Sequence, residues 1–261
     1  MKYIHNILHI SIDDTIQVFK ELTERAPLSI FDLPFFRYFK RLHDKYGLVL
    51  SCYCFFQRGD FTLATCTRNY RTEFEANSDW LRFGFHGFTG NEDYGLQNET
   101  ISGIQYEKVM DNLVEIVGIA SLDSVIRIHR FRASKSFIRE ITTCSKYPVQ
   151  GLLGADDNRP SYFLSKEENE FLIKNFFYKS ACLMVLKTTQ RFDSIKPSSI
   201  YQLFTHFRGG NIFFTHEYYF FPTTMRMKIK AMIIKYLISF TLAYYKFCLG
   251  CVCDFPMNKI K

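Results

Sequence analysis

Seven apolar runs of strand length, separated by segments of helical character, constrain the fold of this chain more than any other feature. The runs occupy residues 3–12, 48–56, 80–88, 125–131, 151–155, 181–186 and 211–214. Helical spacing or capping residues mark the intervening residues 31–46, 68–78, 106–117, 134–144, 165–177 and 198–207. Continuous apolar runs are typical of strands buried on both faces, so the repeated βα units predict a parallel sheet covered by helices and closed, or nearly closed, into a barrel.

Local sequence signals support these boundaries. Ser165 and Glu168 have the spacing of a capping box at the start of a helix. Gly47 and the pair Gly209 and Gly210 stand where two helices should end before a strand. No linker divides the chain, so we expect one domain over residues 1–261, with a core of about residues 3–220 and a C-terminal helical segment at 225–253.

The C-terminal segment is strongly apolar but carries regularly placed lysines. Its longest uninterrupted stretch, residues 236–245, is much shorter than the roughly 20 residues that a bilayer crossing needs. We therefore predict a packed helix and no transmembrane span. Peripheral membrane contact, with the lysines directed toward lipid headgroups, is the alternative for this segment.

Charge and cysteine content exclude several classes of protein. The formal net charge of +7 is spread along the chain and forms no basic stripe with base-reading residues, so we expect no nucleic-acid partner. Eight cysteines in a chain that shows no secretory leader favour reduced thiols and a cytoplasmic location. Cys248, Cys251 and Cys253 lack a second ligand pair at a matching distance, so they do not form a complete zinc site.

Titratable side chains gather where the predicted strands end, which is where barrel enzymes carry their chemistry. These residues are Asp13 and Asp14 on the first strand, His86 on the third, His129 on the fourth, Asp156, Asp157 and Arg159 after the fifth, and His216 and Glu217 after the seventh. Asp13 and Asp14 could serve as a base and a metal ligand on opposite faces of the chain. Alternatively, one of them caps a helix that begins near Thr15.

At these residues the chain resembles the polysaccharide deacetylases of the NodB-homology, or carbohydrate esterase 4, type, over residues 3 to about 220. The family's first motif, T-F-D-D-G, is matched by the run from Ser11 to Thr15, and its second motif begins with a His matched by His86. The resemblance implies a seven-stranded, distorted (β/α) barrel of the glycoside hydrolase/deacetylase type. It also implies that Asp13 is the general base and that Asp14 and His86 are metal ligands.

Three further motifs extend the resemblance. The run from Arg130 to Ala133 occupies the place of R-P-P-[YF] without its prolines, which implies that Arg130 orients the catalytic acid. The family's L-x-H-D motif is matched at His216 and Glu217, which makes His216 the general acid. Asp156 and Asp157 fall at the family's acidic motif. We assign Asp156, Asp157, Arg159 and Glu217 to substrate binding.

The family's second metal-binding His, four residues after the first, is replaced by Gly90. His129, at the end of the neighbouring strand, is our candidate for the missing ligand, and imidazoles with a carboxylate suit zinc or a similar divalent ion. The sequence thus predicts a metal-dependent hydrolase that removes an acyl group from a sugar or polysaccharide. The alternative is a barrel that binds a glycan without metal, or cleaves it with Asp13, Asp157 or Glu217 as acid and base.

Overall fold

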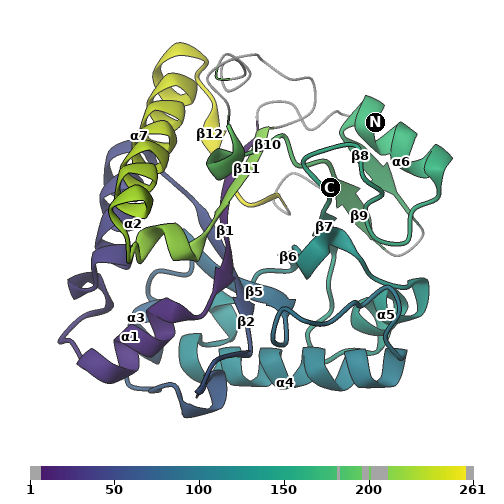
Figure 1. The fold of residues 1–261 in the computed structure, drawn as a ribbon, viewed down its shortest axis with the longest axis horizontal. Helices are drawn as coiled ribbons and strands as arrows, with labels where there is room; N and C mark the ends of the chain where they lie inside the picture. The colour runs from purple at the N-terminus through teal and green to yellow at the C-terminus, as the bar shows by residue number, and fades with distance from the viewer. Residues whose placement is uncertain (1–6, 181–182, 196–199, 201–210, 257–261) are drawn as a thin grey trace.

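The fold is built on two mainly parallel sheets, with helices on the outside (Figure 1). The computed structural model describes residues 7–180, 183–195, 200 and 211–256. The first sheet has the order β10-β11-β1-β2-β5, and β12 pairs with the start of β1. Its strands are β1 (Ile7–Thr15), β2 (Leu50–Phe55), β5 (Leu81–Gly87), β10 (Gln190–Arg191), β11 (Asn211–His216) and β12 (Val252–Cys253).

The second sheet is smaller and has the order β6-β7-β9-β8, with β8 antiparallel to β9. Its strands are β6 (Val125–Ile126), β7 (Gly151–Leu153), β8 (Phe177–Lys179) and β9 (Met184–Leu186). A separate hairpin pairs β3 (Gln57–Arg58) with β4 (Phe61–Thr62). Between the two sheets, a single isolated bridge joins Phe83 to Leu122. The predicted α/β fold with a parallel, helix-covered sheet is confirmed.

Seven helices of the described residues pack around the sheets. They are α1 (Gln17–Arg25), α2 (Pro34–Tyr46), α3 (Arg71–Glu75), α4 (Glu99–Val117), α5 (Lys135–Arg139), which continues as a π-helical turn (Glu140–Cys144), α6 (Lys166–Asn175) and α7 (Met225–Cys248). The Ser165 capping box and the left-handed Gly47 (φ 73°) occur as predicted. Helix α4 begins earlier than predicted, because the Asn98 side chain caps it by accepting from Thr100 N and Ile101 N. The predicted helix at residues 198–207 and the Gly209–Gly210 signal lie outside the described residues, Ile200 excepted.

Two sequence predictions are wrong in extent. The fourth strand was expected over residues 125–131 but ends at Ile126, because Arg130 and Phe131 adopt left-handed backbone angles (φ 60° and 57°) that leave the sheet. The C-terminal segment is helical only to Cys248, after which residues 252–253 return to the first sheet as β12. Among the described residues, no helix combines the length and apolarity that crossing a membrane requires.

Candidate active site

The two acids at the end of β1 point to different partners although they are neighbours in sequence. Asp13 is buried, and its Oδ1 accepts a hydrogen bond from Nη1 of Arg127 at 2.8 Å. Asp14 has a φ of 60°, and its carboxylate lies beside His86 instead. Neither acid caps α1, whose N-cap position is Ile16 with no side-chain cap bond of its own. The capping interpretation of this acid pair is therefore wrong.

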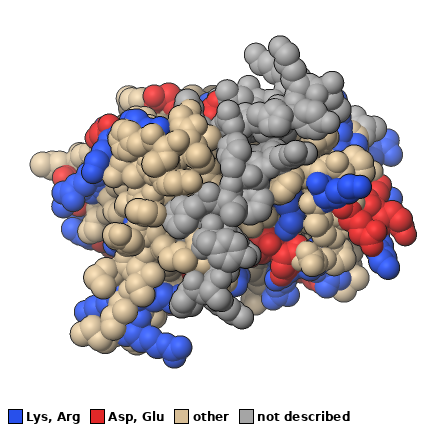
Figure 2. Space-filling view, turned by 90° about the horizontal axis from the view of Figure 1, so that it is seen from above, with Lys and Arg blue, Asp and Glu red and all other residues tan. Residues whose placement is uncertain are grey.

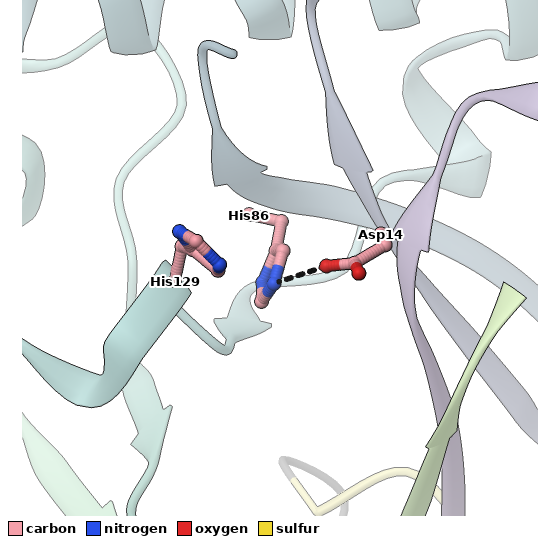
Figure 3. Close-up of side chains that lie close together, drawn as sticks. All are labelled: Asp14, His86 and His129. Atoms are coloured by element: carbon pink, nitrogen blue, oxygen red, sulfur yellow. Dashed lines mark ion pairs between the residues drawn. The ribbon is translucent and has the colours of Figure 1, made fainter. Parts of the chain in front are cut away.

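Asp14, His86 and His129 form a cluster that could hold a metal ion, and it is the one such group found among the described residues. One ligand atom from each side chain lies within 4.8 Å of the others, and Oδ1 of Asp14 is 3.2 Å from Nε2 of His86. Figure 3 shows His86 between the other two side chains. The three ligands come from β1, β5 and the turn after β6.

The hydrogen bonding of His86 leaves its Nε2 atom, which could bind a metal ion, facing Asp14. Nδ1 of His86 lies 2.5 Å from the carbonyl oxygen of Arg127, and because a carbonyl only accepts, Nδ1 carries the hydrogen. In a neutral ring, Nε2 then turns a lone pair toward the Asp14 carboxylate. A cation between them would relieve this repulsion, and the backbone-anchored ring is typical of a metal-ligating histidine.

The other two ligands are in the protonation states that a metal needs. Burial lowers the pKa of His129 to about 4, aided by the neighbouring His86, so the imidazole is neutral near pH 7. Burial alone would raise the pKa of Asp14, but a hydrogen bond from the protonated form of His86 and the charges of His216 and His129 outweigh it and lower the pKa to about 2. The Asp14 carboxylate is therefore charged.

The backbone around this cluster is strained. Asp14, Arg130 and Phe131 all have positive φ angles, which cost free energy in residues other than glycine. Position 90 could not carry a ligand easily, because Gly90 has a φ of 88° and a Cβ atom there would lie 3.1 Å from Cζ of Phe55. Phe55 itself packs against His86 and His129, with ring centroids 5.0 and 5.2 Å apart. Phe55 thus packs against two of the clustered side chains and restricts the space for a side chain at position 90.

Arg127 rather than Arg130 contacts Asp13. The Arg127 side chain is fully buried, and it donates to Oγ of Ser11 at 2.7 Å and to Oγ1 of Thr188 at 3.2 Å as well as to Asp13. Arg130 is exposed and donates to the Gly90 carbonyl oxygen at 3.3 Å. The role predicted for Arg130 is therefore wrong, since the orienting arginine comes three residues earlier, from within the apolar run. The signal that could have identified Arg127 was its charge within an apolar run predicted as a buried strand.

His216 lies next to Asp13, because the two residues are register partners in β11 and β1. Nδ1 of His216 is 3.3 Å from Oδ1 of Asp193, and Oδ2 of Asp193 is 3.4 Å from Nε of Arg191. Burial lowers the pKa of His216, but the bond to Asp193 and the charge of Asp13 outweigh this and raise it overall. No sequence signal pointed to Asp193, which lies in a short 3-10 turn after β10.

Of the residues predicted to bind substrate, Asp156, Asp157 and Arg159 lie near one another, whereas Glu217 is engaged at the start of α1. Glu217 is fully buried and accepts hydrogen bonds from the backbone N–H groups of Ile16, Gln17 and Val18, so its substrate role is wrong. Burial raises the pKa of Glu217 to about 7, against these bonds. Asp157 and Arg159 form an exposed ion pair with each other. Lys187 donates to the backbone oxygen of Asp157, and the charge of the partly buried Asp156 acts on Lys187.

The cysteines provide no second metal site among the described residues. Cys251 and Cys253 are buried and Cys248 is exposed, all as free thiols. Among the described residues, the one cluster of His, Cys, Asp or Glu side chains that could hold a metal ion is the site at Asp14. That the C-terminal cysteines form no zinc site stays a prediction.

Comparison with known proteins identifies the fold. No protein-family model and no curated protein matches the chain. A solved structure described as a candidate polysaccharide deacetylase from Mycobacterium smegmatis aligns with a TM-score of 0.56 and 11% identity, covering 100% of this chain and 90% of that one. Its likeness shows that this chain has the fold of a polysaccharide deacetylase.

Two further solved structures align over most of their length. The Xyl-CE4 domain of a multidomain xylanase, from the hindgut metagenome of Trinervitermes trinervoides, has a TM-score of 0.49 and 8% identity, with coverage of 96% of this chain and 86% of that one. A peptidoglycan N-acetylglucosamine deacetylase has a TM-score of 0.48 and 9% identity, with coverage of 98% and 88%.

Proposed function

We propose that this protein is a metal-dependent hydrolase that removes an acyl group, such as acetyl, from a sugar or polysaccharide. The observation that carries the proposal is the meeting of Asp14, His86 and His129 in one cluster, beside the Asp13–Arg127 and His216–Asp193 pairs. The description of the Mycobacterium smegmatis protein of the same fold as a deacetylase supports the substrate class.

The three clustered side chains would hold a divalent ion, with zinc the ion that two imidazoles and a carboxylate suit best. A bound ion of this kind polarises an acyl carbonyl and lowers the pKa of water toward neutrality. The donor set fits, because Asp14 is charged, His129 is neutral, and the ring of His86 is anchored through Nδ1.

Asp13 and His216 would move the protons. Asp13 accepts a proton from the attacking water as the water oxygen bonds to the acyl carbon, and Arg127 fixes the carboxylate for this role. His216, on the neighbouring strand, donates its proton to the departing nitrogen or oxygen as the bond to the acyl carbon breaks. The products are a carboxylic acid and a free amine or hydroxyl on the sugar. The bond to Asp193 favours the protonated form of His216, because it raises the pKa of that imidazole against the effect of burial.

Metal content is the test of this proposal. We expect about one divalent ion per chain in protein purified without chelator, and near-zero metal in Asp14→Asn, His86→Ala and His129→Ala. The matched control is Asp44→Asn, because Asp44 is an exposed acid paired with Lys40 on α2. Equal, near-zero metal in the wild type and in every variant would exclude the mechanism.

Acyl release from acetylated amino sugars tests the chemistry itself. The wild-type protein should release acetate, and Asp13→Asn should lose this activity while it keeps its metal, because Asp13 is not among the clustered ligands. Loss of both activity and metal in Asp13→Asn would contradict the separate roles of the two neighbouring acids.

A second candidate is a glycan-binding barrel that works without metal. The 3.2 Å contact between Asp14 and His86 favours it, because the same geometry suits an ion pair if the imidazole is doubly protonated. This candidate predicts sugar binding by a metal-free protein and no acetate release. Carboxylate-only cleavage would have to use Asp13 or the exposed Asp157, since Glu217 is engaged by three backbone N–H groups.

A further inference from the structure

Helix α7 has two apolar faces, and only one of them packs on the protein. The inner face contains Ala231, Ile234, Leu237, Ile238, Thr241, Leu242 and Tyr245, all buried. On the outer face, Met225, Tyr236 and Phe247 are 70%, 67% and 68% exposed. The remaining large apolar residues that α7 exposes are Ile229, Met232, Ile233 and Phe240. An exposed apolar surface of this extent marks an interaction site more often than chance.

The exposed residues form one continuous stripe. At 3.6 residues per turn, positions 225, 229, 232, 233, 236, 240 and 247 fall within an arc of about 100°, opposite the buried face. We refer to these seven side chains as the outer stripe. The helix lies along the outside of the molecule, at the left in Figure 1. The corresponding end of the molecule in Figure 2 is a broad tan area with blue cations at several of its margins.

Cations border the outer stripe on both sides. Helical geometry places Arg226 and Lys230 along one edge of the stripe and Lys228, Lys235 and Lys246 along the other. Helix α7 contains no Asp or Glu. Some of the cations are held in place, because Lys230 donates to the Tyr219 hydroxyl at 2.7 Å and Lys246 donates to the Lys45 carbonyl oxygen at 2.9 Å.

This charge pattern distinguishes between the occupants that an apolar stripe could have. A second copy of the chain, packed α7 against α7 about a two-fold axis, would bring the cations of one helix against those of the other, and like charges oppose such pairing. An anionic lipid surface instead accepts apolar and aromatic side chains among its acyl chains while its headgroups meet flanking cations. The helix is not apolar enough to cross the bilayer, so it would lie in the interface plane.

We propose that α7 docks this protein on an anionic phospholipid membrane, with the outer stripe inserted and the bordering cations at the headgroups. This inference is independent of the proposed hydrolase activity, because it uses no residue of the metal cluster.

Vesicle co-sedimentation tests the proposal with the full-length protein. We expect binding to vesicles of phosphatidylcholine mixed with phosphatidylglycerol, much weaker binding to phosphatidylcholine alone, and loss of binding at high salt. The triple variant Ile229→Ser, Tyr236→Ser and Phe240→Ser should bind at least about tenfold more weakly. Charge removal by Arg226→Gln with Lys228→Gln should weaken binding by roughly fivefold for each cation.

A matched control uses equally exposed apolar residues elsewhere, Leu96→Ser, Ile101→Ser and Ile104→Ser, at and before α4. This variant should bind vesicles like the wild type. Failure of the wild type to bind anionic vesicles would overturn the proposal, as would equal loss of binding in the control. A wild-type dimer in light scattering that becomes monomeric in the α7 triple variant, without vesicle binding, would assign the stripe to a second copy instead.

Discussion

The Asp13–Arg127 pair is the most deeply buried ion pair of the candidate site, with both side chains almost fully removed from solvent. Charges in such a position lose their hydration and depend on each other and on neighbouring hydrogen bonds, here those that Arg127 donates to Ser11 and Thr188. If one partner is removed, the other remains as an uncompensated buried charge. A substitution in this pair should therefore affect both the proposed base, Asp13, and the stability of the protein.

We predict that Arg127→Leu lowers the free energy of unfolding by about 3–5 kcal/mol, because it leaves Asp13 buried without its partner. The control is Arg132→Leu, which breaks an exposed 2.8 Å ion pair with Asp93 and should cost only about 0–1 kcal/mol. Urea denaturation of both variants measures the difference. Similar losses in the two variants would show that burial of the Asp13 pair has no special effect.

A second residue-scale prediction concerns the pH dependence of acyl release. His216 must be protonated to act as an acid, so activity should fall as pH rises through its elevated pKa. Asp193→Asn removes the carboxylate that raises this pKa and should move the alkaline limb of the pH–rate profile to lower pH. An alkaline limb that stays in place would show that another group sets it.

At the residue scale, the sequence predicted the acid pair, His86, His129 and His216 as the site, and the structure brings these residues to one region. Their catalytic roles stay predictions. Arg127 and Asp193 were not assigned, for different reasons. Arg127 lies in the run predicted as the fourth strand, but the match to the family motif favoured Arg130, three residues later. Asp193 reaches His216 only through tertiary folding, which no local pattern encodes.

At the scale of elements, Glu217 joins two segments that are far apart in the chain. Its carboxylate accepts from the first three N–H groups of the turn into α1, at 2.7 to 3.0 Å, and so performs the capping task that no local residue performs. These donors directly follow Thr15 at the end of β1, close to the acid pair. A side chain from the end of β11 thereby fixes the exit of β1.

Glu217→Ala should lower the free energy of unfolding by at least about 2 kcal/mol, since three buried N–H groups lose their acceptor. It should also weaken metal binding, because Asp14 lies two residues before the first of these donors. Thermal unfolding and metal titration measure the two effects. The control is Glu167→Ala, an exposed residue in the first turn of α6. Unchanged metal affinity in Glu217→Ala would show that metal binding does not depend on the helix cap that Glu217 provides.

Element boundaries were predictable where local signals set them and not where tertiary contacts do. The Ser165 box and Gly47 gave correct helix ends because their bonds are local. The short β6 was not predictable, because the left-handed turn at Arg130 and Phe131 places non-glycine residues in a conformation that their sequence does not favour. The helix cap supplied by Glu217 is another long-range effect of this kind.

At the scale of the whole molecule, buried histidines should set the response to acid. Burial lowers the pKa of His9 to about 3, with the nearby Arg127 charge acting in the same direction. The unfolded chain then binds more protons than the folded one below about pH 6.5, so stability is complete above that pH and is lost as pH falls toward 3. His129 contributes with the same sign, and His216 with the opposite sign, because its pKa is raised.

We predict that the wild type loses about 2 kcal/mol of stability between pH 7 and pH 5 through His9 alone. His9→Leu should show a correspondingly smaller change over this range, because Leu cannot take up a proton. Urea denaturation at the two pH values provides the measurement. An equal pH dependence in both proteins would mean that His9 does not titrate within the folding transition.

Whole-molecule topology followed from the alternating runs, since each of the seven predicted strands overlaps a strand of the structure. The division into two sheets was not predicted. It arises because β6, β7 and β9 are only two or three residues long. Such short strands have few backbone groups that can pair with a neighbouring sheet. The apolar pattern of the sequence does not show how many residues of a run form strand hydrogen bonds.

The division into two sheets has a consequence for the three clustered ligands. Asp14 and His86 belong to the first sheet, whereas His129 follows β6 of the second. Among the described residues, the one isolated bridge joins Phe83 of β5 to Leu122, shortly before β6. An ion bound by all three would link the two sheets, and its binding free energy would stabilise their packing against each other. Amide protons of β6 would then exchange more slowly in the metal-bound protein than in the metal-free protein. Slow exchange at β6 would thus report that the metal site is occupied.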